Sequence, residues 1–179
     1  WTSNGSPYTL NGQVTIPKGD TLKIEEGTVI NTGASSLIIN GVLEVKGTST
    51  NKVFFSNPSA TTNLFSVNGG KATLNYATFN NFRVLEVRNG VLFVNNSTSD
   101  NSIYLFNKAN LTVYSSQFTA NATVNEYAIH GSGNNNDTLT VNISNSHFKK
   151  YKGAISLVQY KSLNLYVTQN SISEMTSDV

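Results

Sequence analysis

The chain carries ten carboxylates, and a suitably spaced pair of them would be the simplest route to chemistry. Hydrolysis of a glycosidic bond uses two carboxyl groups about 5–9.5 Å apart. Two arrangements stand out: the adjacent Glu25 and Glu26, and the pair Glu44 and Glu86 in the nearly identical segments VLEVK and VLEVR. The full set is Asp20, Glu25, Glu26, Glu44, Glu86, Asp100, Glu126, Asp137, Glu174 and Asp178.

Neither pair is predicted to be catalytic. Adjacent residues of an extended segment point to opposite sides, and Glu25 and Glu26 fall where a turn is expected. Glu44 and Glu86 fall on different strands of the repeat described below, so we expect each to be a single exposed, solubilising carboxylate. The aspartates never occur within a few residues of one another, as calcium ligands commonly do.

Other reactive side chains are equally dispersed. His130 and His147 lie in different predicted strands with no third zinc ligand near them in sequence, and His130 is expected at a solvated strand end. There is no cysteine, which removes disulfides, thiolate metal sites and cysteine nucleophiles. No nucleophile-elbow motif occurs. The sequence therefore predicts no catalytic residues, no metal site and no cofactor.

The elements that would position these residues come from an internal repeat of short strands. Apolar residues occur in pairs spaced by two, which is the strand period, and Gly or Asn interrupts them every few residues. Five segments align without gaps and end on a large apolar residue except at Ser99: ATLNYATF (72–79), LFVNNSTS (92–99), LTVYSSQF (111–118), VNISNSHF (141–148) and LYVTQNSI (165–172). A further strand precedes each: LFSV, VLEV, IYLF, YAIH and AISL.

With two similar units before residue 57, the repeat predicts about seven coils of three strands each. Unequal spacing between the coils places inserted loops near 57–63 and 119–138. Insertions of this kind suit a β-solenoid whose coils stack in parallel, with columns of like residues inside. We expect one all-β domain, with residues 1–13 as a lead-in and partial cap and 14–179 as coils. An antiparallel sandwich is the competing fold, and it would require tight hairpins instead.

The opening segments SPYTLNGQVTIPKGDTLKIEEGTVI and SLIINGVLEVKGTSTNKVFFS resemble the first coils of right-handed parallel β-helices of the pectin-lyase-like superfamily. They are most similar to non-catalytic surface proteins with the pattern SPY…V-x-I-P-x-G-x-T-L-x-I-E-x-G-T. Glu26 stands where that pattern usually has Pro. The resemblance covers roughly residues 6–56 and implies the fold. It implies no single activity, because this scaffold carries lyases, hydrolases, adhesins and structural rods.

The outward positions offer two kinds of site. Phe93, Tyr114 and Tyr166 are candidates for a platform on which sugar rings stack. Seven N-x-S/T sequons are candidates for N-glycosylation: Asn4, Asn95, Asn96, Asn110, Asn121, Asn136 and Asn142. Asn110, Asn121 and Asn136 are expected in turns or loops and Asn142 on an outward face.

Composition narrows the partners. A net charge of +2 with only 12% charged residues gives no basic face for nucleic acid. No apolar run approaches the roughly 20 residues of a membrane helix. Because no capping helix or loop follows the seventh coil, we expect either a piece of a longer rod or copies that stack end to end.

The sequence thus favours a non-enzymatic extracellular or cell-surface solenoid, structural or adhesive, that carries N-glycans and stacks head to tail into a filament. Two alternatives stay open: a carbohydrate-active enzyme, lyase or hydrolase, and a glycan-binding adhesin.

Overall fold

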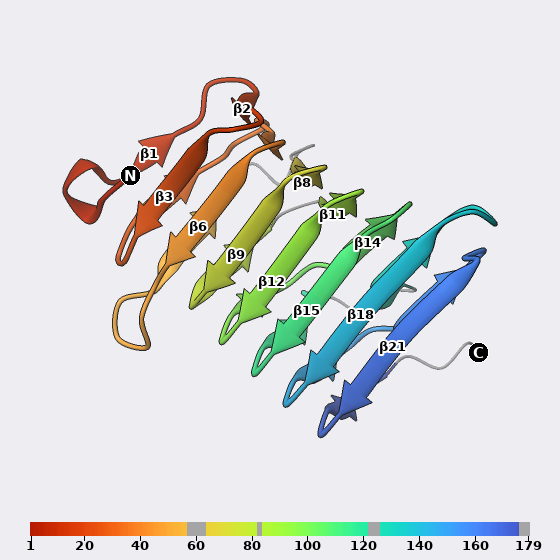
Figure 1. The fold of residues 1–179 in the computed structure, drawn as a ribbon. Helices are drawn as coiled ribbons and strands as arrows, with labels where there is room; N and C mark the ends of the chain where they lie inside the picture. Colours follow the sequence, from red (N-terminus) through yellow and green to blue (C-terminus); the bar gives the residue numbers. More distant parts are fainter. Residues whose placement is uncertain (57–63, 82–83, 122–125, 176–179) are drawn as a thin grey trace.

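A computed structural model describes residues 1–56, 64–81, 84–121 and 126–175 as a right-handed parallel β-helix. Three parallel sheets, which we name A, B and C and define by their strands below, run along one rod. Each coil contributes one strand to each sheet, and the chain passes through them in the order B, C, A. Figure 1 shows the strands of sheet C as a ladder, with the N-terminus at one end of the rod and the C-terminus at the other.

Sheet A has eight strands, and sheets B and C have seven each. Sheet A contains β1 (Tyr8–Thr9), β4 (Val29–Asn31), β7 (Val53–Ser56), β10 (Ala77–Asn80), β13 (Thr98–Ser99), β16 (Gln117–Thr119), β19 (His147–Lys149) and β22 (Ser171–Ser173). Sheet B contains β2 (Val14–Ile16), β5 (Leu37–Ile39), β8 (Leu64–Asn68), β11 (Val84–Arg88), β14 (Ile103–Phe106), β17 (Tyr127–Ser132) and β20 (Gly153–Val158). Sheet C contains β3 (Thr21–Glu25), β6 (Val42–Lys46), β9 (Lys71–Asn75), β12 (Val91–Asn95), β15 (Asn110–Tyr114), β18 (Thr138–Ser144) and β21 (Ser162–Thr168).

The predicted columns are confirmed by the pairing register. Leu43 pairs with Leu22 on one side and Ala72 on the other, and Leu92 joins Ala72 to Leu111. The predicted column of aromatic residues is also present on sheet A, as Phe55, Phe79, Phe118 and Phe148, all buried. Burying each such ring contributes on the order of 2–3 kcal/mol.

Ser99 interrupts this aromatic column for a local reason. Phe55 stacks on Phe79 with ring centroids 4.6 Å apart, and Phe118 stacks on Phe148 at 5.4 Å. Ser99 lies between the two pairs and closes a tight bend: its Oγ accepts a hydrogen bond from the backbone N–H of Asn101 at 3.1 Å. A serine therefore fixes the turn that leads toward sheet B.

The corner between sheets C and A is alike in five successive coils, which follow the longer connections 26–28 and 47–52 of the first two coils. A residue with positive φ occupies it in five successive coils: Tyr76, Asn96, Ser115, Asn145 and Gln169. Next to it runs a buried serine ladder, in which the N–H of Ser97 donates to Ser116 Oγ and the N–H of Ser116 donates to Ser146 Oγ, both at 3.1 Å. The ladder satisfies backbone donors that would otherwise be buried without partners.

Within the insertion expected over residues 119–138, the predicted strand YAIH is present as β17, which occupies residues 127–132. The insertion expected near 57–63 lies outside the described residues.

The two ends of the described rod differ. At the N-terminal end, the amine of Trp1 donates to the carbonyl of Lys23 at 2.7 Å, and the N–H of Glu25 donates to the carbonyl of Trp1 at 2.9 Å. The first residue thereby pairs with the edge strand of sheet C, and a short 3-10 helix (Ser3–Gly5) follows it. At the other end the last strands expose apolar side chains, among them Leu165 and Ile172. Head-to-tail stacking stays a prediction.

Candidate functional site

Three neighbouring strands of sheet B carry a group of reactive side chains on their outer face. Ile103 and Leu105 of β14 point inward, so Tyr104 between them points outward. His130 of β17 pairs in register with Tyr104 and also faces outward. The two rings lie 5.8 Å apart, tilted by 54°. The register of the sheet, rather than sequence proximity, brings them together.

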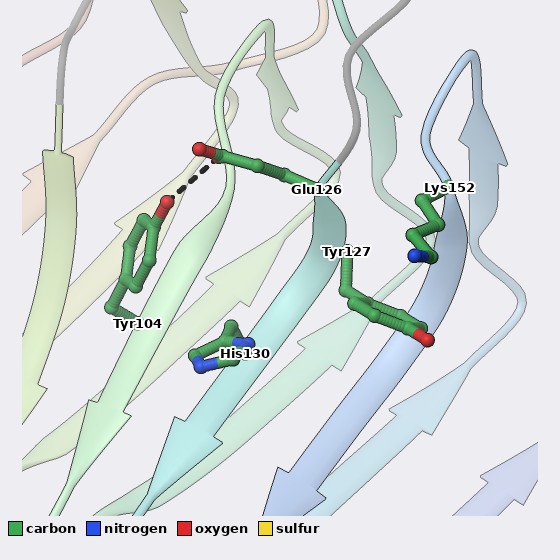
Figure 2. Close-up of a pocket in the computed structure, with 5 residues that line it drawn as sticks. All are labelled: Tyr104, Glu126, Tyr127, His130 and Lys152. Carbon is green, nitrogen blue, oxygen red and sulfur yellow. Dashed lines mark hydrogen bonds between the residues drawn. The ribbon is translucent and has the colours of Figure 1, made fainter. Parts of the chain in front are cut away.

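Two charged residues stand where strands enter sheet B. Glu126 precedes β17 and Lys152 precedes β20, and the backbone N–H of Lys152 donates to the carbonyl of Glu126 at 2.8 Å. The side chain of Glu126 turns back over the sheet, where its Oε2 accepts a 2.7 Å hydrogen bond from the hydroxyl of Tyr104 (Figure 2). Burial, followed by this hydrogen bond and the glutamate charge, raises the pKa of Tyr104 to about 12.

Tyr127 completes the group, and a glycine makes room for it. A Cβ at Gly153 would lie 2.7 Å from Cε1 of Tyr127 and 2.9 Å from Cδ1, so the ring rests directly on the glycine backbone. Figure 2 shows the Tyr127 ring extending from β17 toward β20, below Lys152.

These side chains line an open cavity of about 280 Å³, which we call the sheet B pocket: Tyr104, Glu126, Tyr127, His130 and Lys152. Its lining offers two aromatic rings, one carboxylate, one imidazole and one amine. Only one carboxylate is among these residues, whereas glycoside hydrolysis uses two. The described segments also contain no cluster of three His, Asp or Glu residues that could hold a metal ion.

The carboxylates singled out from the sequence lie elsewhere. Glu25 is the last residue of β3 rather than part of a turn, and it forms a 3.8 Å ion pair with Lys46. Glu26 accepts a 2.9 Å hydrogen bond from the hydroxyl of Thr48. Glu44 also lies 3.8 Å from Lys46, as an outward residue of sheet C.

The expectation that Glu86 is an exposed carboxylate is wrong. It lies on the outer face of sheet B, but only 8% of it is exposed. The hydroxyl of Ser66 donates to its Oε1 at 2.7 Å, and Arg88 donates to both oxygens at 3.1 Å. Both carboxylate oxygens are thus engaged, which suits a structural ion pair.

The histidines divide between the pocket and the scaffold. His130 lies inside β17 and lines the pocket, so the expectation of a solvated strand end is wrong. His147 lies on sheet A, where its ring nitrogens contact the hydroxyls of Ser171 and Ser173 at 2.6 and 3.2 Å.

The sequons occupy varied positions. Asn110 was expected in a turn but begins strand β15, and Asn142 lies half-buried on the outer face of β18 as expected. Asn95 donates to the side-chain oxygen of Asn75 at 3.0 Å. Asn96 is a positive-φ corner residue, and Asn4, Asn121 and Asn136 are exposed. Whether any of the seven carries a glycan stays a prediction.

The three candidate stacking aromatics lie on the outer face of sheet C and do not form one column. Phe93 and Tyr166 share a column in which Thr112 and Asn142 separate them, and the amine of Lys71 lies over the Phe93 ring. Tyr114 lies in the next column, opposite Asn95. Glycan stacking on these residues stays a prediction.

Sequence reasoning missed Tyr104, Glu126, Tyr127 and Lys152 because it compared the outward residues of sheet C only. The available signal was the outward column of sheet B, Ser66, Glu86, Tyr104, His130 and Ser156, which follows once Ile103, Ile129 and Ile155 are aligned.

Comparison with known proteins adds no assignment. No protein-family model, curated protein or solved structure matches this chain. In the part of the chain that the structure describes, no helix is long and apolar enough to cross a membrane.

Proposed function

We propose that this chain is a non-enzymatic, extracellular adhesive β-solenoid that binds a saccharide in the sheet B pocket. The observation that carries the proposal is the lining of that pocket, which combines the rings of Tyr104 and Tyr127 with a carboxylate, an imidazole and an amine. A sugar ring has apolar C–H faces and a rim of hydroxyls. Aromatic side chains match the faces, and charged groups hydrogen-bond the rim.

The positioning of the pocket favours binding of a defined ligand. Tyr104 and His130 project from paired strands, and the Tyr104 hydroxyl is held by Glu126 at 2.7 Å. Side chains that are fixed by a regular sheet lose little conformational entropy when a ligand binds.

Catalysis is the alternative, and the lining weighs against hydrolysis in particular. A hydrolase would need a second carboxylate beside Glu126, and none is among the lining residues. A lyase would need a base to remove a proton from the sugar. Tyr104 is unsuited to that task at neutral pH, because the raised pKa keeps its proton in place, so the imidazole of His130 would have to serve, and the cleavage assay below tests this alternative.

Membership of the pectin-lyase-like superfamily and an extracellular location belong to the same proposal. The opening pattern through residues 6–56 supports the first. The sequons and the low charged fraction are compatible with the second. N-glycans at one or more of Asn110, Asn121, Asn136 and Asn142 would be a direct mark of a eukaryotic secretory route.

The test is an array of neutral hexose oligomers and oligogalacturonates of one to six units, with three proteins compared. We expect wild type and the triple variant Phe93→Ala/Tyr114→Ala/Tyr166→Ala to bind the same sugars, and Tyr127→Ala to lose them. Binding lost in the triple variant and kept in Tyr127→Ala would move the site to sheet C. If mass spectrometry detects cleavage of a bond in any bound sugar, the enzymatic proposal replaces the adhesive one.

A further inference from the structure

A second cavity lies on the outer face of sheet A, across one corner of the rod from the sheet B pocket. It has a volume of about 250 Å³, and its lining is rich in hydroxyl and amide groups: Asn80, Thr98, Gln117, Thr119 and Asn121, with the carboxylate of Asp100. We call it the sheet A cavity. Such groups donate and accept hydrogen bonds without a net charge, as sugar hydroxyls require.

The polar groups of this cavity are held in place. Asp100 Oδ2 accepts hydrogen bonds from the backbone N–H of Asn81 and from the amide of Asn121, both at 2.7 Å, and its Oδ1 accepts one from Asn101 at 2.8 Å. Gln117 donates to the hydroxyl of Thr119 at 3.2 Å. Three successive coils therefore build one fixed polar surface.

The two cavities lie on adjacent sheets, one on each side of the corner where sheet A leads into sheet B. Asp100 of the sheet A cavity is four residues from Tyr104 of the sheet B pocket. Tyr151 lies at the same corner, 1% exposed, with a buried hydroxyl that has no hydrogen-bond partner among the described residues. Burial and then the charges of Asp100 and Glu126, one carboxylate from each cavity, raise the pKa of this hydroxyl.

Toward the N-terminal end of the rod, the outward residues of sheet B are buried. Ser66 and Glu86 point outward from β8 and β11, yet they are only 2% and 8% exposed. A ligand in the sheet B pocket therefore cannot extend along that column toward the N-terminal end. It can extend toward Ser156 in the next coil or around the corner toward the sheet A cavity, and the polar lining of that cavity favours the second course.

Size and charge define the ligand. Pockets for small molecules usually measure about 300–1,000 Å³, so each cavity alone falls just below that range and the two together fall inside it. Their lining contains the carboxylates of Asp100 and Glu126 against the single amine of Lys152, which disfavours a polyanion such as a uronate polymer.

We propose that the two cavities form one extended site for a neutral oligosaccharide, with one sugar unit against Tyr104 and Tyr127 and the next units around the corner against Gln117, Thr119 and Asn121. This inference rests on the proposed saccharide binding and adds the class, the minimum length and the course of the ligand.

The test is calorimetry with neutral hexose oligomers of one to six units and with oligogalacturonates of equal length. The protein is produced in bacteria, so that Asn121 carries no glycan. The hexamer should bind at least tenfold more tightly than the monosaccharide, and Gln117→Ala should reduce that gain at least threefold. Gln13→Ala is a matched control, because Gln13 donates to Thr15 with the same i, i+2 geometry and 3.2 Å distance, far from both cavities. It should leave hexamer binding unchanged.

Each other outcome overturns a defined part of the reasoning. Equal affinity for all lengths, or equal effects of Gln117→Ala and Gln13→Ala, would overturn the extended site and leave the single pocket standing. Tighter binding of oligogalacturonates than of neutral oligomers would overturn the ligand class. Absence of binding to sugars of every length would overturn the proposed function itself.

Discussion

Replacing Gly153 by alanine would test whether Tyr127 is a binding surface. The new Cβ would lie 2.7 Å from Cε1 of Tyr127, whereas carbon atoms in ordinary contact are about 3.5–4.0 Å apart, so the ring must move by about 1 Å. The backbone itself tolerates alanine, because the φ of Gly153 is not positive. Alanine also has less conformational freedom than glycine in the unfolded chain. This difference stabilises the fold by about 0.4–1 kcal/mol and offsets the strain of moving the ring.

We therefore expect Gly153→Ala to leave the free energy of unfolding within about 1 kcal/mol of wild type and to weaken sugar binding about tenfold, which corresponds to about 1.4 kcal/mol. Urea denaturation and calorimetry with the best sugar from the array measure the two quantities.

Gly133→Ala is the matched control, because its Cβ would meet the ring of Tyr160, a tyrosine outside the pocket whose hydroxyl donates to the carbonyl of Leu105 at 3.0 Å. This variant should lose stability and keep sugar binding. Wild-type affinity in Gly153→Ala, or an equal loss of affinity in Gly133→Ala, would refute the role of Tyr127.

Three further predictions address the rest of the molecule. Because the pKa of Tyr104 is raised to about 12, its contribution to stability is complete below pH 10 and is lost as the pH rises toward 12. Tyr104→Phe should therefore remove a late step, near pH 12, from the tyrosinate absorbance titration, and removal of a step near pH 10 instead would show that the surroundings of Tyr104 do not raise its pKa. Ser116→Ala leaves the buried N–H of Ser97 without its partner, so the free energy of unfolding should fall by about 1–3 kcal/mol in urea denaturation, and a loss below 0.5 kcal/mol (about half the lower bound) would contradict the ladder. Mass spectrometry of native material from a eukaryotic secretory route should find glycan on at least one of Asn110, Asn121, Asn136 and Asn142, and four unmodified side chains would exclude it.

The fold could be predicted because the solenoid interior repeats residue types as well as spacing. Leu43, Leu92 and Leu111 lie in one column and Phe55, Phe79 and Phe118 in another, so a gapless alignment of segments is also an alignment of paired strands. The corners between sheets C and A also helped to predict the fold, because they too repeat residue types. The recurring Asn and Ser residues between sheets C and A are required there by positive φ and by the serine ladder.

The sheet B pocket could not be predicted in the same way, because its residues are not of one type repeated from coil to coil. Tyr104 and His130 are 26 residues apart in the chain and become neighbours only when Ile103 is paired with Ile129. The inward phase of IYLF and YAIH is ambiguous in sequence, since both alternate residues of each segment are large or apolar. Glu86 misled for a related reason: its outward phase is correct, but outward residues are not all exposed.

The position of the pocket follows from a difference between the corners of the rod. The corner between sheets C and A is committed to the backbone over much of the rod: five successive coils place a positive-φ residue there, and the serine ladder joins three of them. The corner between sheets A and B has no such ladder in the described residues, and the chain between the strands varies in length and type there, from residues 32–36 in an early coil to Asp100–Ser102 in a later one. Variation at that corner costs the stacked core little, because the strands on either side keep their register. Charged and aromatic side chains can therefore gather at this edge, where Asp100, Tyr104, Glu126, Tyr127 and Lys152 are found.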